Sequence, residues 1–145
     1  MWFEIIFVIV SLYKFSNHKF KDFLALFFSL IIGFLLARFA GLFYSHLQPF
    51  AIDGFEPIIY HAPDNSFPSD HLVIGGALAS FLFTVNKKSG LVAFILALGV
   101  ALGRVMGGIH YPIDVIAGLA IGVLAAIILK KIFDLIRGYS GMGEN

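Results

Sequence analysis

The sequence predicts an all-α protein, a polytopic bundle of transmembrane helices with about five spans. Three observations predict it: a very apolar composition, several long apolar runs, and basic and acidic connecting segments that alternate. Hydrophobic residues make up 59% of the 145 positions and charged residues only 13%, whereas soluble domains carry about 25% charged residues. We therefore expect a single integral-membrane domain over residues 1–145.

Four apolar runs are long and continuous enough to be helices in a bilayer. They cover residues 23–43, 71–85, 91–106 and 113–132. A bilayer core takes roughly 20 helical residues, and the runs lack the alternation of a strand. A fifth run, 2–13, is counted as a span, although its reach of about 18 Å also suits a tilted or interfacial helix.

Small residues recur within these runs at spacings that let helix backbones approach closely in lipid. Gly75 and Gly76 are adjacent, and Gly118 and Gly122 are four residues apart. We interpret these glycines as packing positions rather than functional ones.

The charged residues indicate how the chain is oriented. Eight of the ten basic residues lie in three segments: between runs 2–13 and 23–43, between runs 71–85 and 91–106, and from the end of run 113–132 onward. They are Lys14, Lys19, Lys21, Lys87, Lys88, Lys130, Lys131 and Arg137. The intervening segments, 45–70 and 103–114, hold five acidic residues and one basic residue. By the positive-inside rule, the Lys-rich segments and the C-terminus face the cytoplasm, and the other two segments face outward.

Composition also excludes several kinds of chemistry and partner. The chain has no Cys, which removes disulfides, thiolate catalysis, zinc–thiolate sites and iron–sulfur clusters. A net charge of +1 offers no basic face, so no nucleic-acid partner is expected. No cleavable signal peptide is expected, because Glu4 stands where such a signal carries positive charge.

Two short polar stretches carry the candidate chemistry. The first is Ser66-Phe67-Pro68-Ser69-Asp70-His71, and the second runs from Gly103-Arg104 to His110-Tyr111-Pro112-Ile113-Asp114. Both are predicted at helix ends on the outward face. Ionisable residues are expensive in so apolar a chain, which favours a functional role for them.

The second stretch offers a nucleophile and a cation. His110 and Asp114 are four residues apart, so a helix that begins near Pro112 would bring the carboxylate close to the imidazole. A carboxylate on one ring nitrogen fixes the tautomer and leaves the other nitrogen free to attack. Arg104 supplies a forked cation that suits phosphate oxygens.

The first stretch offers an anion site and an acid. Ser69 is predicted at a helix N-terminus, where free backbone N–H groups favour an anion. His71 adds a second imidazole that can protonate a leaving oxygen. Together the two stretches suit phosphoryl transfer through a phosphohistidine.

These stretches resemble the second and third signature motifs of the type 2 phosphatidic acid phosphatase (PAP2) superfamily. The usual second motif, Pro-Ser-Gly-His, stands here as Pro68-Ser69-Asp70-His71. The third is Ser-Arg, five residues, His, three residues and Asp. Here Gly103 replaces its Ser, and Arg104, His110 and Asp114 have the required spacing. Segments 61–71 and 108–114 are most similar to the bacterial undecaprenyl-diphosphatase branch, the BcrC type.

The resemblance implies a PAP2/haloperoxidase-like fold and a membrane lipid phosphatase that hydrolyses the terminal phosphate of a polyprenyl diphosphate such as undecaprenyl diphosphate. It implies that His110 attacks the phosphorus, that Asp114 orients His110, and that His71 protonates the leaving lipid phosphate and then activates water. It assigns the phosphate oxygens to Ser69, Arg104 and the backbone near Asp70. No metal or cofactor is implied. The partners are the lipid substrate and the membrane.

The first signature motif of the family, Lys, six residues, Arg-Pro, is not kept. Aligning its proline with Pro49 puts Gln48 at the Arg position and Gly41 at the Lys position. Two phosphate-neutralising charges are therefore absent, which predicts slower turnover. Gln48 can still donate hydrogen bonds to a phosphate.

Arg38 lies one helical turn before Gly41. It either leans toward the site as a substitute phosphate ligand, or snorkels to the interface or pairs with Asp53 or Glu56. The family also commonly has six spans, with two before the first motif. Here one full span and the short run 2–13 occupy that region.

Three other functions stay open. The substrate could instead be phosphatidylglycerophosphate or phosphatidate. Because Gly41 and Gln48 replace cations, a catalytically weak protein that binds lipid phosphates is a second alternative. A small transporter subunit ranks last, because only Arg38 approaches the mid-span charge that such a protein needs.

Overall fold

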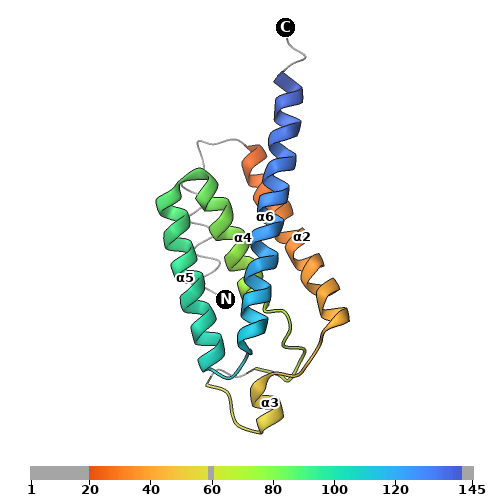
Figure 1. The fold of residues 1–145 in the computed structure, drawn as a ribbon, viewed down its shortest axis with the longest axis vertical. Helices are drawn as coiled ribbons and strands as arrows, with labels where there is room; N and C mark the ends of the chain where they lie inside the picture. Colours follow the sequence, from red (N-terminus) through yellow and green to blue (C-terminus); the bar gives the residue numbers. More distant parts are fainter. Residues whose placement is uncertain (1–19, 59–60, 142–145) are drawn as a thin grey trace.

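The computed structural model describes residues 20–58 and 61–141, and this part of the chain is helical without a β-strand (Figure 1). Its helices are α2 (Phe20–Phe43), α3 (Pro49–Asp53), α4 (Asp70–Val85), α5 (Lys87–Met106) and α6 (Pro112–Gly141). The predicted helical membrane fold is confirmed. The predicted span 2–13 lies outside the described residues.

The four long helices correspond to the four long apolar runs. Three of them contain segments long and apolar enough to cross a membrane: Leu24–Phe43, Lys87–Met106 and Pro112–Ile136. Helix α4 has 16 residues, about 24 Å at the usual rise. Large apolar side chains are exposed along α2, α5 and α6, including Leu35, Leu96 and Ile128. Such surfaces suit lipid rather than water.

Helix α6 is longer than the apolar run that predicts it. The run ends at residue 132, but the helix continues to Gly141. Lys130 and Asp134, one turn apart, form an ion pair along it at 2.6 Å.

Helix α4 lies between α5 and α6, and α2 packs against α6 and α4 (Figure 1). Glycines let α4 and α6 touch backbone to backbone. A Cβ on Gly118 would lie 2.4 Å from the Ser69 carbonyl oxygen, and one on Gly122 would lie 2.1 Å from that of Val73. A Cβ on Gly76 would lie 2.4 Å from the Leu119 carbonyl oxygen. These glycines are therefore packing positions, as predicted.

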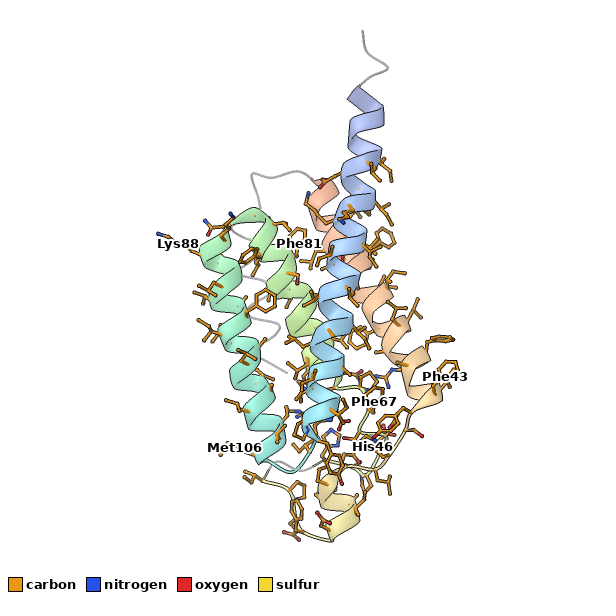
Figure 2. The ribbon with its side chains drawn as sticks, viewed as in Figure 1. Phe43, His46, Phe67, Phe81, Lys88 and Met106 are labelled. Carbon is orange, nitrogen blue, oxygen red and sulfur yellow. The ribbon has the colours of Figure 1, made fainter. Side chains whose placement is uncertain are left out.

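This packing gathers several helix ends at one end of the bundle. The C-terminal ends of α2 and α5, helix α3, and the N-terminal ends of α4 and α6 all lie there (Figure 1). Figure 2 shows His46 and Phe67 at this end and Lys88 at the opposite end. Both polar stretches of the sequence therefore meet at one end of the molecule.

Candidate active site

The segment between α2 and α4 folds across the helix ends through a few backbone hydrogen bonds. The Ser66 N–H donates to the His46 carbonyl at 2.8 Å, and the Phe50 N–H donates to the Gly108 carbonyl at 3.1 Å. The Asn65 side chain accepts from the His46 and Phe67 N–H groups and donates to the Phe67 carbonyl. The loop is thereby fixed beside the start of α6.

Helix α6 carries Asp114 in its first turn, and this carboxylate is fully buried. Its Oδ2 accepts hydrogen bonds from the Ser66 hydroxyl at 2.5 Å and from the Tyr111 N–H at 2.8 Å. Nε2 of His46 lies 3.1 Å from its Oδ1. Because a buried carboxylate is costly without partners, the two hydrogen bonds to Oδ2 offset part of that cost, whereas Oδ1 has no hydrogen-bond partner among the described residues.

His110 is also buried, but its nearest partner is not Asp114. Its Nδ1 lies 2.9 Å from the Ser66 carbonyl oxygen and 3.1 Å from the Ser66 hydroxyl. The distance from Nδ1 to Asp114 Oδ2 is 3.7 Å, too long for a hydrogen bond. A carbonyl only accepts, so Nδ1 carries the proton and Nε2 keeps its lone pair. The hydrogen bond to Ser66 therefore sets the tautomer of His110. Asp114 contacts Ser66 rather than the imidazole ring itself.

The electrostatic surroundings keep His110 neutral. Burial, and secondly the nearby Arg104 cation, lower the pKa of the His110 imidazole from 6.5 to about 4. Arg104 lies in the last turn of α5, and its carbonyl accepts from the Ile109 and His110 N–H groups. An unprotonated imidazole next to a cation suits attack on an anionic phosphate.

The second motif begins α4. Ser69 is the N-cap residue and is fully buried, and its N–H donates to the Asp114 carbonyl at 3.1 Å. Its hydroxyl has no hydrogen-bond partner among the described residues. His71 lies in the first turn of α4 and is partly buried. The structure therefore joins the second and third motifs through Ser69, Ser66 and Asp114.

The structure shows the contacts of the residues in the first-motif region. Gln48 is buried, and its Oε1 accepts from the Asp64 N–H at 2.7 Å, so this part of its side chain holds the loop. Arg38 forms an ion pair with Asp70, which stands at the Gly position of the usual second motif, rather than with Asp53 or Glu56. Arg38 thus leans toward the second motif. A Cβ on Gly41 would lie 3.2 Å from the Asn65 amide nitrogen and from the Phe67 carbonyl oxygen.

Sequence reasoning does not single out Ser66 or His46. Ser66 opens the first polar stretch, but the resemblance assigns it no role. His46 lies in the outward-facing segment 45–70, outside both polar stretches. Neither motif spacing nor helical periodicity relates these residues to Asp114, since the contacts form only when the loop folds over α6.

A bundle of apolar helices with His110, Asp114 and Arg104 gathered at one end defines a class: helical membrane proteins with a polar site at the helix ends. Residues 22–137 match the PAP2 superfamily, and the chain belongs to it.

Similar proteins agree with this family. The bacitracin transport permease protein BcrC of Bacillus licheniformis is 38% identical over 98 residues, which cover 67% of this chain and 48% of that protein. The undecaprenyl-diphosphatase BcrC of Bacillus subtilis (strain 168) is 30% identical over 109 residues, covering 75% and 56%. The chain therefore spans about half the length of these curated relatives.

A solved structure shares the fold. The transmembrane PAP2 type phosphatidylglycerolphosphate phosphatase from Bacillus subtilis superimposes with a TM-score of 0.71 at 23% identity. The match covers 93% of this chain and 70% of that one.

Proposed function

We propose that this chain is a membrane lipid phosphatase that removes the terminal phosphate of a polyprenyl diphosphate such as undecaprenyl diphosphate. The observation that carries the proposal is the state of His110: Nδ1 is held by the Ser66 carbonyl, and the lowered pKa leaves Nε2 unprotonated. The similarity to an undecaprenyl-diphosphatase supports the substrate class.

In the first step, Nε2 of His110 bonds to the terminal phosphorus, and the bond from that phosphorus to the bridging oxygen breaks. His71 gives its proton to the leaving lipid monophosphate. Water then attacks the phosphohistidine and gives a proton to His71, while the phosphorus–nitrogen bond breaks. Inorganic phosphate leaves, and His110 returns to its neutral form.

The phosphate oxygens are assigned to Arg104, to Ser69 and to the backbone N–H groups at the start of α4. The unpartnered, fully buried Ser69 hydroxyl supports this assignment, because such a group is costly without a ligand. Arg38 supplies a further cation, if the incoming phosphate displaces Asp70 from the ion pair.

We also propose that the site faces outward and that the C-terminus is cytoplasmic. The positive-inside rule supports this orientation, since Lys88 lies at the end of the bundle opposite His46 (Figure 2). Single cysteines at Glu56 and Asn86 test it in intact cells with an impermeant maleimide. Labelling at position 56 alone is expected, and labelling at position 86 alone would reverse the orientation.

Phosphate release by the purified protein tests the function. Undecaprenyl diphosphate, phosphatidylglycerophosphate and phosphatidate are compared, with His110→Ala as the inactive variant and His61→Ala as a matched histidine control. We expect fastest release from the diphosphate and none from His110→Ala. Faster release from phosphatidylglycerophosphate would select the activity named for the solved structure. If the protein binds lipid phosphates but releases phosphate from none of them, it is a lipid-binding protein and not a phosphatase.

A further inference from the structure

Ser66 lies at the centre of the site, and its side chain is fully buried. Its hydroxyl donates to Asp114 Oδ2 at 2.5 Å and lies 3.1 Å from His110 Nδ1 and 3.3 Å from the Ile109 carbonyl oxygen. Its own carbonyl oxygen lies 2.9 Å from the same Nδ1. Among the described residues, both groups within hydrogen-bond distance of His110 Nδ1 therefore belong to Ser66.

We infer that Ser66 is the positioning residue for His110, and that Asp114 acts on His110 through Ser66 rather than directly. The inference rests on the proposed function, in which His110 is the nucleophile. Three distances support it, because the direct path of 3.7 Å is longer than the two links through the hydroxyl, 2.5 and 3.1 Å.

The chemical need for this link arises during attack. When Nε2 bonds to phosphorus, the ring becomes cationic and Nδ1 keeps its proton. Two oxygens of Ser66 then accept from Nδ1, and the Asp114 carboxylate holds the hydroxyl with its lone pair toward the ring. Such an indirect contact fixes orientation and stabilises the developing charge without touching the substrate.

Kinetics of Ser66→Ala give the first test. We expect kcat to fall about 10- to 100-fold with KM unchanged, and Ser66→Thr to restore part of kcat because it keeps the hydroxyl. Ser29→Ala is the matched control, since Ser29 is a buried serine on α2 whose hydroxyl donates to the Ala25 carbonyl. A Ser66→Ala protein with normal kcat would overturn the inference.

A double-mutant cycle separates the indirect path from a direct one. Asp114→Asn is expected to lower kcat strongly in the wild-type background and only slightly in the Ser66→Ala background. Equal fold-losses in the two backgrounds would mean that Asp114 acts on His110 without Ser66.

Nitrogen-15 NMR of labelled histidines tests the same link without activity. We expect neutral His110 to carry its proton on Nδ1, and Asp114→Asn to shift this resonance in the wild type but not in Ser66→Ala. A proton on Nε2, or equal shifts in both backgrounds, would overturn the inference. Failure of the proposed function is recognised separately, as absence of phosphate release from wild-type protein whose NMR result is as expected.

Discussion

Nε2 of His46 lies 3.1 Å from Oδ1 of Asp114, on the opposite side of the carboxylate from Ser66. His46 follows α2, Ser66 precedes α4, and Asp114 lies in the first turn of α6, so this buried carboxylate has neighbours from two segments that are far from it in sequence. The His46 ring also packs edge-on against Tyr44 and Tyr111. The loop and the third motif are thereby held as one unit.

Replacing His46 should destabilise the protein through Asp114. His46→Leu leaves Oδ1 buried without a polar neighbour, and we expect a loss of about 1–3 kcal/mol in the free energy of unfolding. His46→Gln places an amide N–H where Nε2 stood and should lose less. Thermal unfolding in one detergent measures both, with His61→Gln as control. A His46→Leu protein as stable as His46→Gln would show that the contact does not support the carboxylate.

Replacing Arg38 should lower kcat/KM more than it lowers the stability of the protein. Its ion pair with Asp70 is exposed, with side-chain exposures of 62% and 41%, and exposed pairs contribute little to stability. As a phosphate ligand, however, Arg38 would make charge-assisted bonds, so Arg38→Gln is expected to lower kcat/KM roughly 10-fold or more. Lys88→Gln, at the far end of the bundle, is the control. An unchanged kcat/KM for Arg38→Gln would mean that Arg38 pairs with Asp70 but does not bind the substrate phosphate.

The lowered pKa of His110 predicts its pH behaviour. Only the neutral imidazole can attack, so a pKa of about 4 keeps the free enzyme's nucleophile active at pH 5–6, where an ordinary histidine with a pKa of 6.5 is mostly protonated. Arg104→Gln removes the second cause of the shift and should raise this pKa, while burial keeps it below 6.5. NMR titration of His110 measures both values. A wild-type pKa at or above 6.5 would contradict this prediction.

Replacing Gly118 with alanine should disrupt the packing of α6 against the start of α4. A Cβ there would lie 2.4 Å from the Ser69 carbonyl oxygen, so Gly118→Ala must push the second motif away from α6. We expect a cost of about 1–3 kcal/mol together with reduced phosphate release. Gly99→Ala on α5 is the matched control, because a Cβ there meets nothing within 4 Å and alanine favours a helix. Equal unfolding temperatures for the two variants would contradict this close packing.

Sequence reasoning could predict the parts of this protein that depend on local pattern. Continuous apolar runs predict α2 to α6 except the short α3. The residues around Pro112 predict a helix that begins there, and the structure has Asp114 in the first turn of α6 and His110 just before it. The partner of Arg38 could not be predicted, because Asp70 is 32 positions away. The contacts of Ser66 and His46 with Asp114 depend on how the loop folds across the helix ends, and no local period records that.

The central claim is that His110 becomes phosphorylated during turnover. Undecaprenyl diphosphate labelled in its terminal phosphate, mixed with the protein and quenched in alkali, tests this most directly, because phosphohistidine survives alkali and is lost in acid. We predict base-stable label on the peptide that contains His110, and none in His110→Ala. Label on another residue, or full phosphate release by His110→Ala, would contradict the claim.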